Sequence, residues 1–289
     1  MAELRPRPGH YLLLAAAAHG CDVVTLRGLL SAGLDVDHVC RSGGDDSDWR
    51  DGSEDGYCLT PLQHVCKSGM NSGGNNIEGR VDCVKLLIEH GACLDAGARG
   101  NPGESTDTHP TLTPLLYAAY SGDLDIVKML ISAGGDVNAL IPPDRGGPAM
   151  STLLMAAISY QAANQNDPKN CDAVIETLLR AGANANPPEV NGPPFMDMAI
   201  RHGRRRIWPL LLRAGAIMPT GESSYRPPNY DTHRAHPYLL KIDAAGGFKA
   251  YEKAHRTKLL ATFTPKFTHL VPPELVPLIV EFSFHIGFY

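Results

Sequence analysis

The chain has 289 residues and a formal net charge of −5 at pH 7, with hydrophobic residues at 43% of positions. This length exceeds what one compact core usually supports, whereas an array of small repeated units adds its core one interface at a time. The negative charge disfavours nucleic acid as a partner. No uninterrupted apolar span reaches the roughly 18 residues of a transmembrane helix, so we expect no membrane association.

Seven cysteines are scattered along the chain, an odd number without the spacing of a disulfide framework. Such usage is typical of a reducing compartment, so we expect a cytoplasmic protein, with the nucleus as the alternative. The start of the chain, Arg5 and Arg7 followed by YLLLAAAA, also imitates a secretory signal. The other interpretation, which we favour, is that this run forms the first helix of a repeat.

The chain repeats a pattern of two glycine positions twelve residues apart, with an apolar segment between them. Glycine suits both positions because it adopts the left-handed backbone that ends a helix, and asparagine is the next best residue there. In chain order the pairs are Gly20 and Gly33 (one residue longer), Gly79 and Gly91, Gly122 and Gly134, Asn170 and Gly182, and Gly203 and Gly215.

A threonine-proline-leucine opening precedes two of these pairs, at Thr60 and Thr113, and Ser151-Thr152-Leu153 approximates it before a third. The threonine hydroxyl can cap a helix, and proline fits the first helical position because an N–H there would lack a partner. Small residues such as Ala118 then let two helices pack closely. The segment Leu112 to Ala139 therefore predicts two short helices joined by a turn.

This segment resembles an ankyrin repeat, a unit of about 33 residues with a β-turn and two helices. The resemblance implies an all-α fold, an ankyrin-repeat α-solenoid with β-turn fingers and a C-terminal helical cap. It places an ankyrin repeat domain at 1–221 and a linker with a C-terminal helical segment at 222–289. The five repeats are expected at about 9–40, 58–97, 111–140, 150–187 and 193–219.

The histidine that is usual in the family's TPLH tetrapeptide is missing from every copy. The residues in its place are Leu14, Gln63, Leu116, Leu154 and Asp197. We therefore expect a weaker hydrogen-bond network at the opening of each repeat.

Three insertions interrupt the pattern. Arg41 to Cys58 is acidic and predicts a flexible loop, because its calcium-like spacing fails where Arg50 stands in place of an EF-hand ligand. Lys67 to Glu78 and Tyr160 to Lys169 replace the short turns inside copies two and four. They are either recognition loops or tolerated surface insertions.

Copy five departs from the others in two ways. Arg201 and the run Arg204 to Arg206 surround Gly203, which predicts a solvated basic face or a patch for an acidic partner. Pro209 stands inside the expected second helix, so that helix should start late or kink.

Two helices are expected after the polar, proline-rich segment Gly221 to Pro237. The first is amphipathic, runs from Phe248 and ends before Pro265. The second begins at Pro272 and is apolar nearly all round, so it should be buried against the last repeat or against another protein.

This tail resembles an extension found on ankyrin proteins of single-celled algae. Leu270 to Phe282 also looks like the opening of an F-box, although too few residues follow it. The stretch around Leu259 lacks the early cysteine of a SOCS box. We favour a helical cap, with a ligase-recruiting box as the alternative.

Catalytic and metal motifs are missing. The sequence has no G-x-x-x-x-G-K-[ST] loop, no G-x-S-x-G elbow and no H-E-x-x-H helix, so we expect no enzyme, no cofactor and no small-molecule substrate. The set Cys58, His64, Cys66 and Cys83 has the spacing of no usual zinc site. Cys66 and Cys83 occupy helix positions where cysteine acts as a small buried hydrophobe, so we expect no metal.

The resemblance implies that other proteins bind at the ends of the inner helices. Matching the positions before each turn gives the candidates His19, Lys67, Tyr117, Tyr120, Ser121, Ser159, Arg201 and His202. The two tyrosines are the strongest anchors because tyrosine is enriched at interfaces. The alternative is that one or both pack on the next repeat.

Asn138 lies in a pattern that resembles the sites of asparaginyl hydroxylases, and its more ordinary role is to brace a loop. The sequence thus predicts a non-enzymatic scaffold that binds other proteins on the concave face of the solenoid. The alternative is a substrate adaptor of a ubiquitin ligase that uses the C-terminal helices as a recruiting box.

Overall fold

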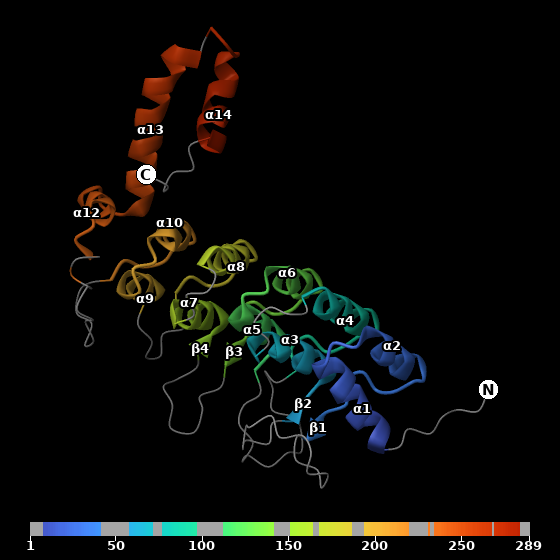
Figure 1. The fold of residues 1–289 in the computed structure, drawn as a ribbon. Helices are drawn as coiled ribbons and strands as arrows, with labels where there is room; N and C mark the ends of the chain where they lie inside the picture. Colours follow the sequence, from blue (N-terminus) through green and yellow to red (C-terminus); the bar gives the residue numbers. More distant parts are fainter. Residues whose placement is uncertain are drawn as a thin grey trace. The chain divides into compact units, whose positions relative to one another are not determined.

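The computed structural model describes residues 8–41, 58–71, 77–96, 112–141, 151–163, 168–186, 194–219, 231, 234–267 and 269–283. These residues are mostly helical, and their contacts divide the chain into two compact units (Figure 1). Unit 1 comprises Met1–Ala183 and Glu189–Gly192, and unit 2 comprises Asn184–Pro188 and Pro193–Tyr289.

Unit 1 holds four helix pairs in two layers (Figure 1). The inner layer consists of α1 (Pro8–His19), α3 (Pro61–Asn71), α5 (Pro114–Ser121) and α7 (Leu153–Ala163). The outer layer consists of α2 (Val23–Ser31), α4 (Ile77–Glu89), α6 (Leu124–Ser132) and α8 (Pro168–Arg180). Each helix contacts its own partner and the next helix of its layer, which confirms the predicted all-α solenoid.

Two short antiparallel pairs connect successive helix pairs. β1 (Cys40–Arg41) pairs with β2 (Cys58–Leu59), and β3 (Leu140–Ile141) pairs with β4 (Ser151–Thr152). The predicted acidic loop and its calcium alternative concern 42–57, which lie outside the described residues.

The openings of the inner helices follow the predicted capping chemistry. The hydroxyl of Thr113 accepts a hydrogen bond from the N–H of Leu116 at 3.2 Å, and Pro114 is the first residue of α5. Gly122 ends the helix in the left-handed conformation, at φ 74°. Leu115 and Ala118 between them are buried, so the cap positions a fully packed segment.

Gln63 overturns the expectation of a weak opening network in copy two. Its Oε1 accepts from the N–H of Thr60 at 2.7 Å, and its own N–H donates to the Thr60 hydroxyl at 3.3 Å, a reciprocal capping arrangement. Its Nε2 also donates to the carbonyls of Ala96 and Leu112, at 2.9 and 3.0 Å. The amide therefore ties copy two to the residue that precedes the Thr113 cap of copy three.

Three of the predicted turn positions lie elsewhere. After α1 the left-handed residue is Cys21 (φ 56°) rather than Gly20, which restores the spacing of twelve to Gly33. Gly79 lies inside α4 and Asn170 inside α8. The insertions account for Gly79 and Asn170. In the two copies that carry an insertion the outer helices α4 and α8 have 13 residues and include these positions, whereas α2 and α6 have 9.

Side chains in the fingers brace one repeat against the next. A carboxylate oxygen of Asp37 accepts from the N–H of Cys93 at 2.8 Å, and one of Asp95 accepts from the N–H of Asp136 at 3.1 Å. The Asn138 amide donates to the carbonyl of Gly182 at 3.2 Å, which confirms the bracing role of Asn138. Its hydroxylation stays a prediction.

Unit 2 contains the fifth helix pair and the tail. Its elements are α9 (Phe195–Arg201), η1 (Arg205–Ile207), α10 (Trp208–Arg213), α12 (Pro237–Ala244), α13 (Phe248–Phe267), η2 (Pro273–Leu275) and α14 (Val276–Ser283). The outer helix starts late, with Pro209 in its first turn, as predicted. The helix α12 was not predicted, because the polar segment before it hid its start.

The tail packs against the fifth helix pair within unit 2. The ring of Trp208 meets that of His236 edge-on at 5.5 Å, and Arg213 of α10 pairs with Glu252 of α13 at 3.3 Å. The boundary between the two compact units therefore lies before the fifth helix pair and not after residue 221. The predicted domain at 1–221 stays a prediction.

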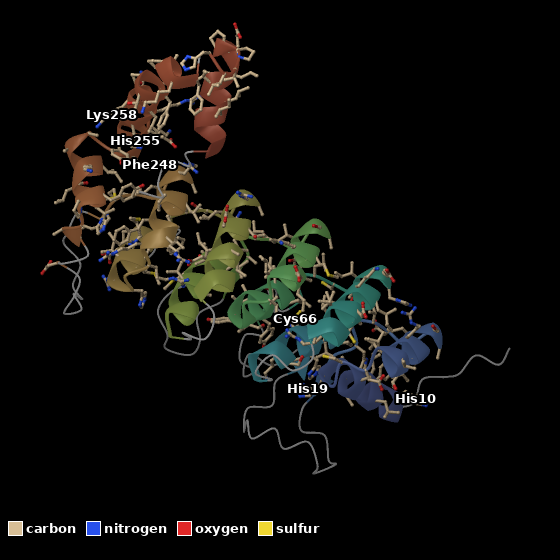
Figure 2. All side chains as sticks on the ribbon, turned by 45° about the horizontal axis from the view of Figure 1, so that its top comes forward. His10, His19, Cys66, Phe248, His255 and Lys258 are labelled. Carbon is tan, nitrogen blue, oxygen red and sulfur yellow. The ribbon has the colours of Figure 1, made fainter. Side chains whose placement is uncertain are left out.

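One prediction about the tail helices was wrong. The helix α13 runs through Pro265 to Phe267, and the rings of Phe263 and Phe267 stack at 5.9 Å, which continues its half-buried face past the proline. The last helix was expected to be buried against the last repeat or against another protein. Leu275 and Leu278 are 44% and 60% exposed within the chain, so burial against another protein stays a prediction. In the described part of α14, a helix that contacts α13, Val276 is fully buried. Figure 2 marks Phe248 and His255 on α13.

Candidate protein-binding surface

The capping threonines fix the register of the inner helices. The hydroxyls of Thr60, Thr113 and Thr152 each accept from the N–H three residues later. Seven residues after each threonine stand Lys67, Tyr120 and Ser159, which therefore occupy one equivalent position in α3, α5 and α7.

His19 occupies the same position in α1. The N–H of Cys21 donates to the Ala18 carbonyl as the N–H of Gly122 donates to the Ala119 carbonyl, so His19 and Tyr120 are the second residues before the left-handed position. We call His19, Lys67, Tyr120 and Ser159 the inner row. The structure places these four candidates at equivalent positions of the four inner helices.

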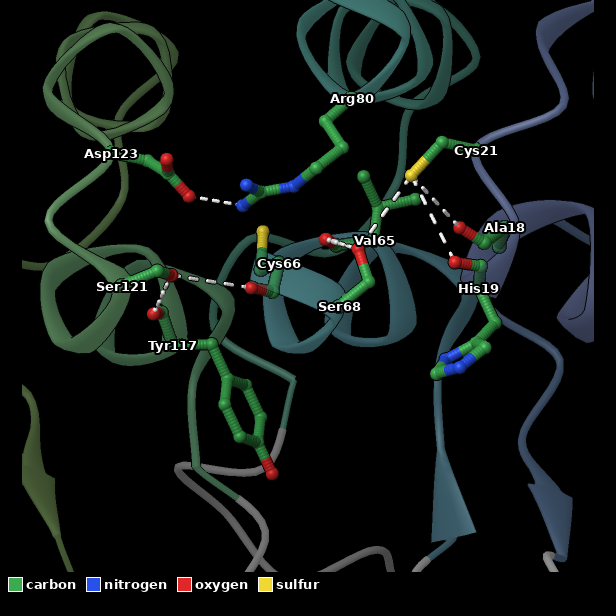
Figure 3. Close-up of polar contacts among 10 residues, drawn as sticks. All are labelled: Ala18, His19, Cys21, Val65, Cys66, Ser68, Arg80, Tyr117, Ser121 and Asp123. Atoms are coloured by element: carbon green, nitrogen blue, oxygen red, sulfur yellow. Dashed lines mark hydrogen bonds and ion pairs between the residues drawn. The ribbon is translucent and has the colours of Figure 1, made fainter. Parts of the chain in front are cut away.

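The described side chains of the inner row are accessible in part. His19, Lys67 and Tyr120 are half-buried, and nothing is described for the Ser159 side chain. Figure 3 shows His19 and Tyr117 pointing away from the outer helices, whereas Cys21, Cys66 and Ser68 point between the two layers. His19, the member of the inner row that Figure 3 labels, thus lies on the side of the inner helices turned away from the outer layer, which we call the inner face of unit 1.

Tyr117 and Ser121 contribute to packing. The side chain of Tyr117 is 5% exposed, so the packing alternative holds for this tyrosine. The Ser121 hydroxyl donates to the Tyr117 carbonyl at 2.7 Å and to the Cys66 carbonyl at 3.5 Å. Ser121 therefore braces the end of α5 against α3, beside the accessible Tyr120.

The two remaining candidates belong to unit 2. Arg201 pairs with Asp197 one helical turn earlier at 2.5 Å, with the carboxylate almost wholly buried. His202 is exposed. Partial desolvation, followed by repulsion from the positive charges of Arg204 and Arg201, lowers its pKa. Arg205 and Arg206 are exposed, which fits both alternatives, a solvated basic face and a patch for an acidic partner.

A polar cluster lies behind the inner row, between the layers. Arg80 of α4, which is almost fully buried, pairs with Asp123 at the start of α6 (Figure 3). Burial raises the pKa of the Cys66 thiol, and burial followed by the charges of nearby groups raises that of Cys83 to about 12. Both cysteines are buried as predicted, and the part of the chain that is described contains no metal-binding cluster of His, Cys, Asp and Glu.

His64 is the functional candidate that sequence reasoning missed, having considered it only for zinc. It stands one turn before Lys67, and its ring meets that of His19 edge-on, with the ring centroids 6.1 Å apart. The signal was its place three residues before an inner-row position, but the pairing with His19 depends on how α1 packs on α3.

None of the helices whose residues are described is long and apolar enough to cross a membrane. Residues 8–141 match the family model of ankyrin repeats, with three copies. An ankyrin repeat and KH domain-containing protein of Caenorhabditis briggsae is 30% identical over 148 residues. The match spans 50% of this chain and 5% of that relative, so the chain represents a small part of the relative's length.

Proposed function

We propose that this chain, whose residues 8–141 match the family model of ankyrin repeats, acts as a non-enzymatic scaffold that binds a partner protein on the inner face of unit 1. Ankyrin repeats generally mediate protein–protein interaction and typically carry no catalysis. We further propose that this scaffold acts in the cytoplasm or the nucleus.

The supporting observation is the step at the end of α5. α3, α5 and α7 each begin directly after a capping threonine, but α5 has 8 residues and its neighbours have 11. The difference of three residues corresponds to about 4.5 Å along a helix. Tyr120 is half-buried and lies near the end of α5, the short helix between the longer α3 and α7.

A recessed tyrosine is a suitable anchor for a partner. Tyrosine offers a large contact area and a hydroxyl at low entropic cost, and binding energy concentrates on such residues where neighbours exclude water. The backbones of α3 and α7 continue past the level of Tyr120. Ser121, held by two carbonyls, keeps the end of α5 in place.

The test is affinity purification with the full chain as bait, followed by quantitative mass spectrometry. Tyr120→Ala is compared with the wild type and with Lys128→Ala, which changes an exposed residue of the outer helix α6. We expect proteins retained by the wild type and by Lys128→Ala to be lost from Tyr120→Ala. If every retained protein also binds Tyr120→Ala, the inner face is not the binding surface.

A second candidate, the ubiquitin-ligase adaptor, is favoured by three exposed leucines in the tail. Leu270, Leu275 and Leu278 are 71%, 44% and 60% exposed in and beside α14. Replacing all three by serine should abolish co-purification with a ligase core subunit and leave Tyr120-dependent binding intact. A wild-type chain that brings down no ligase subunit rules the adaptor out.

A further inference from the structure

The carboxylates of unit 1 are segregated by layer. The chain has 31 aspartates and glutamates, yet the four inner helices α1, α3, α5 and α7 contain none. The described acids of unit 1 lie instead in the outer helices α4, α6 and α8, just before α2 and α6, and in the fingers, for example Asp82 in α4, Asp125 in α6 and Asp136 in a finger.

Helix stability does not account for this distribution. Aspartate and glutamate stabilise the first turn of a helix because they complement the helix dipole, but none of the four inner helices has an acidic residue there. Burial accounts for the leucines and alanines of these helices, but not for the half-buried positions of the inner row. The absence of acids from these positions therefore points to a requirement of the inner surface itself, namely of what binds there.

The groups that replace the acids can bind a carboxylate. Lys67 and His19 belong to the inner row, and the ring of His64 on α3 meets that of His19 edge-on. Lys67 carries a positive charge, and an imidazole N–H can donate a hydrogen bond to a carboxylate. The charge of Lys67 stands out against a chain of net charge −5.

We propose that the partner presents an acidic segment to the inner face, with carboxylates against His19 and Lys67 and an apolar side chain against Tyr120. This inference rests on the proposed function and adds the chemical class of the partner. Complementary charge steers the encounter and rejects basic segments, and the electrostatic part of the binding is screened by salt.

The experiment selects peptides from a random displayed library on the full chain. We expect the selected peptides to be richer in aspartate and glutamate than the input library, and to bind more weakly as salt rises. Lys67→Glu should weaken them about fivefold, because a partly exposed charge pair contributes up to about 1 kcal/mol. The matched control is Lys85→Glu, the same charge change on the exposed face of α4, which should leave binding unchanged.

Different outcomes separate the two claims. Peptides that need Tyr120 but are not enriched in acids overturn the acidic partner and leave the scaffold proposal standing. Acidic peptides that lose affinity with Lys85→Glu as much as with Lys67→Glu also overturn it, because general attraction then explains the binding. If single-stranded RNA binds in a Lys67-dependent manner and acidic peptides do not, the partner class is wrong. Peptides indifferent to both Tyr120 and Lys67 overturn the scaffold proposal as well.

Discussion

Arg80 of α4 and Asp123 at the start of α6 form an ion pair between two repeats, with 4% and 15% of their side chains exposed. Removing one partner of a buried pair strands the other charge, which costs more than the pair itself contributes. Arg80→Met should therefore lower the free energy of unfolding by about 3 kcal/mol. Urea denaturation of the wild type and the variant measures this loss.

The matched control is Lys85→Met, the same replacement of a cation on the exposed face of α4. It should change stability by less than about 0.5 kcal/mol. Equal losses for the two variants would mean that the ion pair contributes nothing specific.

Gln63 should be a stability hot spot of copy two. Its amide makes three side-chain hydrogen bonds, to Thr60, Ala96 and Leu112, and the side chain is 1% exposed. Gln63→Leu keeps the volume and leaves an N–H and two carbonyls without this amide, so the free energy of unfolding should fall by about 2–3 kcal/mol. Leu116→Gln, at the same position of copy three, should not be stabilising, because Leu116 lies in an apolar core.

Replacement by alanine should have opposite effects at two glycines, because one adopts a left-handed backbone and the other lies inside a helix. Gly122 has φ 74°, so Gly122→Ala should destabilise by about 1 kcal/mol. Gly28 lies inside α2, and a Cβ there would meet no atom within 4 Å. Gly28→Ala should therefore stabilise by about 0.5–1 kcal/mol. Thermal unfolding of both variants checks the signs, and a loss with Gly28→Ala would contradict the helical assignment.

The buried thiol of Cys83 predicts sensitivity to alkaline pH. Its pKa is raised to about 12 in the folded chain, against about 8.5 in an unfolded one. The stabilisation is full below the unfolded value and is lost as pH rises from there through the folded value. Cys83→Ala should flatten the alkaline fall of the unfolding midpoint, whereas Cys93→Ala, at an exposed cysteine, should leave it unchanged.

Ending the chain at Gly221 should lower the unfolding midpoint by several degrees. The tail contributes Leu239 and Ile242 to the core of unit 2, and His236 contacts Trp208 of α10. Calorimetry of both chains, with a dye for exposed apolar surface, measures the effect. An unchanged midpoint would mean that the tail stabilises nothing, which favours the adaptor.

The sequence by itself determined what depends on local chemistry. Thr113, Pro114 and Gly122 predicted the start and end of α5, because capping and left-handed turns are decided within a few residues of chain. The late start of α10 at Pro209 followed from a missing N–H, and the burial of Cys66 and Cys83 from their helix positions. The period of the pattern predicted the solenoid.

Only the tertiary structure decided what depends on packing between repeats. The left-handed backbone of Cys21 and the helical state of Gly79 follow from how the connections close, not from residue preference. Gln63 substitutes for the missing histidine because the carbonyl of Leu112, far along the chain, comes within 3.0 Å. The inner row and the His19–His64 pair likewise exist only once α1, α3 and α5 are stacked side by side.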